Sequence, residues 1–94
     1  MNKFKIAHIK QQGQSVIIIP MESNFEYKTS NQQLRITNSL QFCATNAGLV
    51  GTVVPVWLHG RQMRFIAPRL WHPFLKSLSW NDVLKNINKE LTLG

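Results

Sequence analysis

Acidic residues are scarce in this sequence of 94 residues. Four acidic side chains stand against eleven lysines and arginines, which gives a formal net charge of +7. The acids are Glu22, Glu26, Asp82 and Glu90. A charge of this sign attracts nucleic acids, anionic membranes and acidic proteins, and it also keeps a small protein soluble. Because the basic residues are scattered along the chain, the pattern favours solubility and leaves nucleic-acid binding as an alternative.

Cysteine and long apolar runs are also scarce. The single cysteine, Cys43, excludes an internal disulfide framework and is compatible with a reducing compartment. No window approaches the ~18 apolar residues of a membrane span, and the first ten residues hold no signal-peptide core. We therefore expect a cytoplasmic protein that has no membrane partner.

Motifs for catalysis, cofactors and metals are missing. The three histidines, His8, His59 and His72, share no zinc-type spacing with Cys43 or the acids. The glycines form no phosphate-binding fingerprint. Cys43 falls on the apolar stripe of a predicted helix, where a thiol usually acts as a small hydrophobe. The sequence thus predicts no catalytic residue, no cofactor and no metal site, and a small-molecule pocket or enzyme is the less favoured alternative.

Strand-forming residues, by contrast, are abundant in the first twenty positions. Residues 3–9 alternate between two faces, as a half-buried strand does. Residues 15–20, SVIIIP, form a β-branched run typical of a strand buried on both faces. Gly13 supplies the turn of a hairpin, and Pro20 ends the second strand because proline cannot donate to a ladder.

Two helices are predicted. Thr29 or Ser30 caps the first, which runs to about Ala47 and ends at Gly48 in a left-handed cap. Its apolar stripe consists of Ile36, Leu40, Cys43, Ala44 and Ala47. Ser79 and Asp82 resemble a capping box that opens the second helix. We expect that helix to continue to the end of the chain, because Trp80, Leu84, Ile87 and Leu91 recur at heptad-like spacing.

A second hairpin lies between these helices. Its first strand covers residues 52–58, and Pro55 places that strand at a sheet edge or a bulge. Its return strand, 62–67, turns Phe65 toward the core and Arg64 away from it. The resulting order ββαββα predicts a single α+β domain over residues 1–94. We expect a four-stranded, mostly antiparallel sheet with two helices packed on one face.

The loop that follows the second hairpin carries the predicted site. We expect Phe74 to anchor this loop in the core, while three residues are exposed and bind a partner. These partner-binding residues are Arg69, Trp71 and His72, since Arg and Trp are enriched at energetic hot spots. A packed imidazole bonded to the backbone is the alternative for His72. The accompanying basic surface consists of Arg61, Arg64 and Lys76.

Two segments, AGLVGTVVPVW and RQMRFIAPRLWHPFLKSL, resemble small uncharacterised bacterial proteins of the kind encoded by mobile integron gene cassettes. The likeness covers roughly the second half of the chain. The turn LHGRQ, which has one glycine, is shorter and more basic than in that group. The resemblance implies a bacterial protein and no particular activity. We therefore expect a non-enzymatic accessory protein that forms a homo-oligomer and binds a protein or small molecule through residues 69–74.

Overall fold

Five strands form one mixed sheet in the computed structural model, which describes residues 2–93. They are β1 (Asn2–Gln11), β2 (Gln14–Pro20), β3 (Thr52–His59), β4 (Gln62–Phe65) and β5 (Lys89–Leu93). Their order is β4-β3-β2-β1-β5, in which β2 and β3 are parallel and the other neighbours antiparallel. The predicted α+β class is confirmed, but the four-stranded ββαββα arrangement is wrong in strand number and order.

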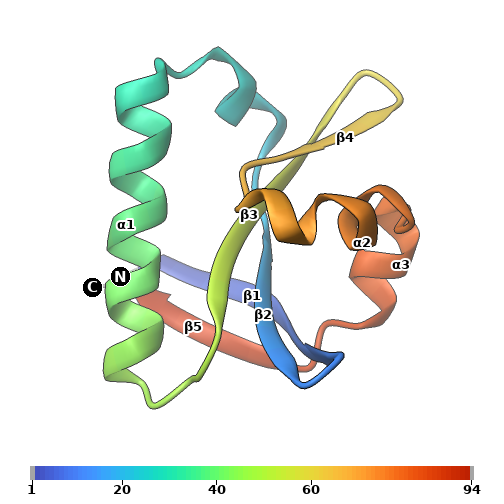
Figure 1. Cartoon of the computed structure of the whole chain (residues 1–94). Coiled ribbons are helices and arrows are strands. Elements are labelled where there is room, and N and C mark those ends of the chain that lie inside the picture. The colour runs from blue at the N-terminus through green and yellow to red at the C-terminus, as the bar shows by residue number, and fades with distance from the viewer. Residues whose placement is uncertain (1, 94) are drawn as a thin grey trace.

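Helices cover both faces of the sheet, not one face as predicted. They are α1 (Ser30–Asn46), α2 (His72–Lys76) and α3 (Trp80–Lys85), with 3-10 turns η1 (Ser23–Tyr27) and η2 (Arg69–Trp71). Figure 1 shows α1 on one side of the sheet and α2 and α3 on the other. The parallel pair requires a crossover between β2 and β3, and α1 forms that crossover. The face of the sheet opposite α1 is covered by α2 and α3. Among residues 2–93 no helix is long and apolar enough to span a membrane.

The buried run in β2 explains why both faces must be covered. Val16 and Ile18 belong to the cluster under α2 and α3, whereas Ile17 and Ile19 belong to the cluster under α1. All four side chains are fully buried, as predicted for a strand enclosed on both faces. The α2–α3 cluster also contains Ala7, Val54, Val56, Trp71, Leu75 and Val83. The α1 cluster also contains Ile6, Leu40, Ala44, Val53 and Leu91.

The first helix forms where the pattern predicted it. Thr29 Oγ1 accepts from the Gln32 N–H at 3.1 Å, and the Gln32 side chain accepts from the Thr29 N–H at 3.0 Å. Leu40 and Ala44 are buried against the sheet. Gly48 ends the helix with φ at 79°, a left-handed value that suits glycine. The predicted cap and C-terminal glycine are confirmed, and so is the stripe from Ile36 to Ala44, whereas Ala47 at its end is exposed.

The last helix is much shorter than predicted. Ser79 and Asp82 form the predicted capping box, but α3 ends at Lys85. The Asn86 side chain there donates to the Asp82 carbonyl at 2.7 Å, a bond that competes with helix continuation. Lys89–Leu93 instead form β5, so that Leu91 is buried beneath α1 while Glu90 stays exposed. The helical prediction fails because β5 pairs with the first half of β1, which does not pair with β2.

Pro55 lies in an interior strand and not in an edge strand as predicted, at the point where β4 stops pairing and one side of β3 becomes open. The Val56 carbonyl accepts from Met21 on the β2 side at 2.7 Å, whereas the Pro55 carbonyl accepts from Ile66 on the β4 side at 3.2 Å. The N–H and C=O of one strand residue point the same way. The donor that Pro55 lacks would therefore face β4, at the point where β4 stops pairing. The parallel β2–β3 ladder is left intact.

A side-chain amide covers the edge of β3 beyond β4. Gln41 of α1 accepts from the Val53 N–H at 2.8 Å and donates to the Gly51 carbonyl at 3.1 Å. The amide thus takes the place of a peptide group in a neighbouring strand. An uncovered edge of this kind would invite pairing with another chain, and Gln41 prevents it.

Candidate functional site

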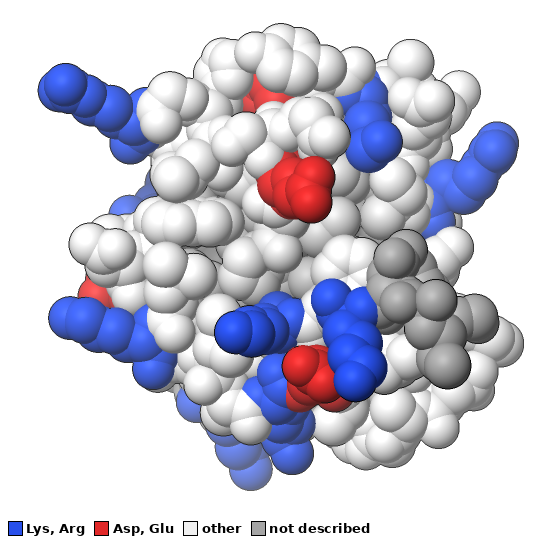
Figure 2. All heavy atoms as spheres, turned by 180° about the vertical axis from the view of Figure 1, so that it is seen from behind, with Lys and Arg blue, Asp and Glu red and all other residues white. Residues whose placement is uncertain are grey.

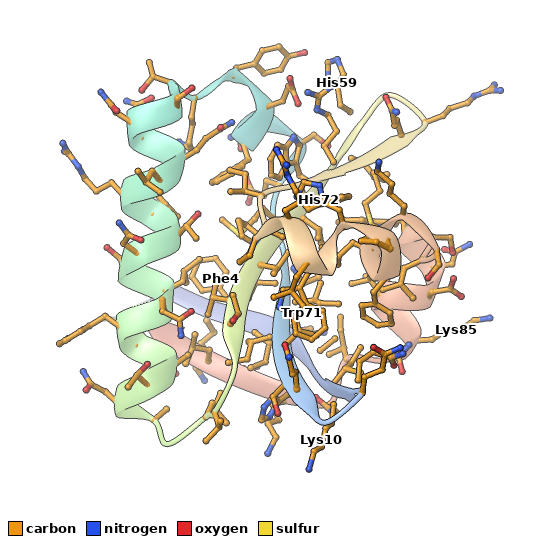
Figure 3. All side chains as sticks on the ribbon, in the orientation of Figure 1. Phe4, Lys10, His59, Trp71, His72 and Lys85 are labelled. Atoms are coloured by element: carbon orange, nitrogen blue, oxygen red, sulfur yellow. The ribbon has the colours of Figure 1, made fainter. Side chains whose placement is uncertain are left out.

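The predicted partner-binding loop is anchored by Trp71. This side chain is only 4% exposed and belongs to the cluster between the sheet and α2 (Figure 3). Phe74 packs edge-on against it, with ring centroids 6.0 Å apart. The predicted exposure of Trp71 is wrong because α2 follows η2 directly and the tryptophan ring is buried on the sheet side. Phe74, the predicted anchor, is a partly buried neighbour.

His72 closes the loop instead of presenting a free imidazole. Its Nε2 donates to the Ala67 carbonyl at 2.9 Å, and its ring packs in a T-shaped arrangement with Phe65, with ring centroids 5.1 Å apart. This is the packed, backbone-bonded alternative raised by the sequence. Of the three predicted contact residues, only Arg69 is classed as exposed, and its neighbour Leu70 is 62% exposed. The accessible part of the loop is therefore Arg69 and Leu70.

An uncharged hollow of about 410 Å³ lies beside this loop. One wall is the β1–β2 turn and the other is the segment from η2 to the end of α2. The lining residues are Gln11, Gln12, Gln14, Leu70, Trp71, Pro73, Phe74 and Ser77. The hollow offers carboxamides and a hydroxyl next to apolar surface, which suits hydrogen-bonding ligands without charge.

The three predicted basic residues do not form one surface. Arg64 Nε lies 3.1 Å from Glu26 Oε1, which also accepts from the Trp57 indole at 2.8 Å. The acid therefore offsets the charge of Arg64. Arg61 and Lys76 are exposed and line one hollow of about 350 Å³ between β4 and the helices α2 and α3. Two of the three predicted residues are thus brought together.

A second cationic hollow opens where β1 leaves β2. Residues 7–11 of β1 pair with β2, whereas residues 2–6 pair with β5. The hollow has a volume of about 690 Å³, and Lys3, Lys5 and Lys28 line it with one acid, Glu22. Sequence reasoning missed it because the end of α3 and the start of η1 form its other walls. Its one local signal was the pair of lysines two residues apart on β1.

The basic side chains are mostly free of acidic partners. Eleven lysines and arginines share two ion pairs within residues 2–93, Arg64 with Glu26 and Lys3 with Glu90 at 3.9 Å. The second pair joins two exposed side chains and contributes little to stability. Figure 2 shows basic side chains gathered around one acidic group in the lower half of that face, and others at its margins. Within residues 2–93 the surface therefore carries an excess of positive charge without acidic partners.

The solvent side of α1 is polar and almost uncharged, and it carries two large apolar side chains. Leu34 and Phe42 are 54% and 67% exposed. At roughly 100° of rotation per residue, they lie about 40° on either side of Asn38. The three residues form one row along the helix, spaced by four positions. Arg35 is the single charged residue among the seventeen of α1.

Two titratable groups outside these surfaces, His8 and Asp82, have structural partners. His8 Nε2 donates to the Val50 carbonyl at 2.7 Å. In the capping box the Ser79 N–H donates to Asp82 Oδ2 at 2.9 Å, and Ser79 Oγ accepts from the Asp82 N–H at 3.1 Å. Hydrogen bonds from Ser79 lower the pKa of the Asp82 carboxyl. No group of three or more His, Cys, Asp or Glu side chains that could hold a metal occurs within residues 2–93.

Comparison with known proteins gave no relative of this chain. No protein-family model, curated protein or solved structure matches its sequence or fold.

Proposed function

We propose that the chain is a small accessory protein of the cytoplasm that forms a homodimer through α1 and binds an anionic partner. The dimer proposal rests on the symmetry of the exposed row Leu34, Asn38 and Phe42 on α1. Leu34 and Phe42 lie four residues on either side of Asn38. A two-fold axis at Asn38 therefore places Leu34 of one copy against Phe42 of the other.

The residue on the axis suits this arrangement. Asn38 would meet its own copy, and a carboxamide can donate and accept at once, so that two of them can pair. Apolar side chains as exposed as Leu34 and Phe42 gain from burial, by about 1.5–3 kcal/mol for each one fully covered.

Electrostatics favours the same face. Two chains that each carry a charge of +7 repel one another over most of their surfaces. On α1 the repulsion is weakest, because its single charge is Arg35. Because Arg35 is three residues from Asn38, the same two-fold axis separates the two Arg35 residues by about 9 Å along the helix.

Association through α1 leaves the rest of the surface for the partner. Arg69 and Leu70 are the accessible contact residues of the 69–74 loop. The free lysines and arginines make an acidic partner the favoured class. The resemblance to integron cassette-encoded proteins is consistent with an accessory role and is part of this proposal.

Light scattering and sedimentation at tens of micromolar test the dimer. We expect Phe42→Glu to give a monomer, since it places a charge opposite Leu34. The matched control is Leu70→Glu, an equally exposed apolar residue in the 69–74 loop, and it should remain a dimer. A monomeric wild type would remove the proposal. Dissociation by Leu70→Glu alone would move the interface to the loop.

A cysteine cross-link tests the axis itself. In a Cys43→Ser background, Asn38→Cys should form a disulfide-linked dimer under mild oxidation, because the two thiols would meet on the axis. Ser39→Cys is the control, because it is exposed but lies about 100° further round the helix. Equal cross-linking of both variants would contradict the predicted axis.

Nucleic-acid binding is the second candidate, and one observation favours it. Arg61 and Lys76 line the same hollow as Phe65 and Trp80, which combines cations with aromatic rings. Single-strand binders use this combination for phosphates and bases. A gel shift with random single- and double-stranded probes decides the matter. Binding that weakens with salt and is lost in Arg61→Glu and Lys76→Glu supports it, and no shift at about 50 mM salt excludes it.

A further inference from the structure

The cationic hollow beside β1 coincides with an unfinished edge of that strand. Gln11 and Gln14 flank a two-residue turn and are therefore a hydrogen-bonded pair. Such pairs alternate along an antiparallel ladder, so Ile9 and Ala7 also exchange bonds with β2. Odd-numbered residues of β1 thus point their backbone groups toward β2. Lys5 and Lys3 are the next two residues of this series.

The opposite edge of β1 confirms the alternation. The N–H and C=O of His8 bond the Asn88 side chain, and the Ile6 carbonyl accepts from the Asn88 N–H at 3.0 Å. Even-numbered residues therefore face β5. The backbone groups of Lys3 and Lys5 face the hollow.

Nothing in β2 completes this edge. The register would bring Pro20 opposite Lys5, and proline has no N–H for the Lys5 carbonyl. Glu22 would come opposite Lys3, but the Glu22 carbonyl accepts from Phe25 in η1. Within residues 2–93 no backbone bond joins Lys3 to Glu22. The backbone N–H and C=O of Lys3 and the carbonyl of Lys5 are thus available to another strand.

The side chains around this edge define the ligand. Lys3 and Lys5 are two residues apart and share one face of β1, and Lys28 adds a third cation. Two acids accompany these lysines: Glu22 lines the hollow, and Glu90 of β5 lies opposite Lys5 and 3.9 Å from Lys3. Phe4, between the two lysines, points to the opposite face and packs toward the α1 cluster with Met21. The hollow therefore combines three cations with apolar side chains, which are Phe4 and Met21 on the α1 face and Leu84 and Ile87 from the end of α3.

We propose that an extended acidic peptide binds here by adding a strand to β1. Its backbone exchanges two hydrogen bonds with Lys3 and donates one to the Lys5 carbonyl. Two acidic residues of the peptide, two positions apart, lie opposite Lys3 and Lys5. The residue between them is apolar and contacts Phe4 and Met21. The recognised pattern is acidic, apolar, acidic. This assignment deepens the proposed function by giving the acidic partner a contact at β1, apart from Arg69 and Leu70, and it rests on that function for the partner's role.

Fluorescence anisotropy with a labelled peptide tests the site. The probe has Glu-Val-Glu at its centre, and two matched probes carry Gln-Val-Gln or N-methylated glutamates. We expect the unmodified probe to bind at low salt, and each modified probe to bind at least about tenfold more weakly. Equal binding of the N-methylated probe would show that charge alone attracts the peptide and would overturn strand addition.

Protein variants locate the site. Lys5→Glu should weaken binding by about tenfold or more, since it replaces an attractive cross-strand pair by a repulsive one. Lys10→Glu lies on the same strand outside the hollow and should change affinity by less than about twofold. Hydrogen exchange at the Lys3 amide should slow when the peptide binds. Equal effects of Lys5→Glu and Lys10→Glu would place the peptide elsewhere.

Two further measurements separate this inference from its rivals. A thymidine oligonucleotide that displaces the peptide and binds more tightly would assign the hollow to nucleic acid, which overturns the peptide proposal. Phe42→Glu should bind the peptide with unchanged affinity, because Phe42 lies on the solvent side of α1 and does not line the hollow. Absence of peptide binding, together with a dimer that Phe42→Glu dissociates, would defeat this inference and leave the α1 dimer standing.

Discussion

Asn88 holds both backbone groups of His8. Its Oδ1 accepts from the His8 N–H at 3.0 Å, and its Nδ2 donates to the His8 carbonyl at 3.0 Å. The pairing of β1 with β5 has just ended at Ile6 and Lys89. The side-chain amide thus continues the ladder by one residue after the backbone has turned away, as Gln41 does at the edge of β3.

Replacing Asn88 should destabilise the fold. Asn88→Ala removes two hydrogen bonds and should lower the free energy of unfolding by about 1–2 kcal/mol, measured by urea denaturation. Asn88→Asp keeps the acceptor for His8 N–H but loses the donor, so an intermediate loss is expected. Asn86→Ala is the control, because that side chain makes one bond at an exposed helix end. A larger loss in Asn86→Ala would contradict the role of Asn88.

Gln41→Ala should expose the edge of β3. The Val53 N–H loses its acceptor, so its hydrogen exchange should accelerate, and the stability should fall by about 1–2 kcal/mol. Val54 is the internal control, because its N–H points to β2 and should stay protected. Gln41→Glu should not rescue the fold, since a carboxylate cannot donate to the Gly51 carbonyl. If Gln41→Glu were as stable as the wild type, the Gln41 amide would not be stabilising the edge of β3 through both hydrogen bonds.

Alanine substitutions of Trp71 and Arg69 should differ clearly in their effect on the free energy of unfolding. Trp71→Ala empties a buried site and should cost about 3–5 kcal/mol by thermal or chemical unfolding. Arg69→Ala alters an exposed side chain and should stay within about 0.5 kcal/mol. If Trp71→Ala were as stable as wild type, the loop would be free of the core and the original prediction of an exposed tryptophan would revive.

Acid should loosen the start of α3. Bonds from Ser79 hold the pKa of the Asp82 carboxyl below 3.8, its ordinary value. A lowered folded-state pKa means that the carboxylate contributes stability above that ordinary value. The contribution disappears as the pH falls through the folded-state pKa. Asp82→Asn should therefore flatten the fall of the melting temperature below about pH 4, and identical pH profiles of both proteins would disprove the contribution.

Local signals in the sequence predicted the local structure well. The Thr29 cap, the Ser79–Asp82 box, the left-handed Gly48 and the doubly buried run of β2 depend on neighbours within a few residues. Each follows from spacing and backbone preference alone. These are the features that a single sequence can establish.

The wrong predictions concern contacts between distant segments. Leu84, Ile87 and Leu91 fit a helix as well as they fit a helix end followed by a strand. The contact between His8 and Asn88, 80 positions apart, reveals the strand only in three dimensions. Trp71 was expected at the surface because its burial depends on β2 and β3, which lie far from it in the sequence. The α1 row was not singled out, since exposed apolar residues are common on helices.

The division of β1 between two partners has a kinetic consequence. Closing the β1–β5 ladder requires a loop of about 80 residues, whereas the β1–β2 hairpin needs only a turn. Contacts of such long range form late in folding. Until β5 docks, residues 2–6 of β1 are a strand with two open edges, which is the form most prone to pairing between chains. Slow docking of β5 would therefore set how readily this basic protein aggregates as it is made.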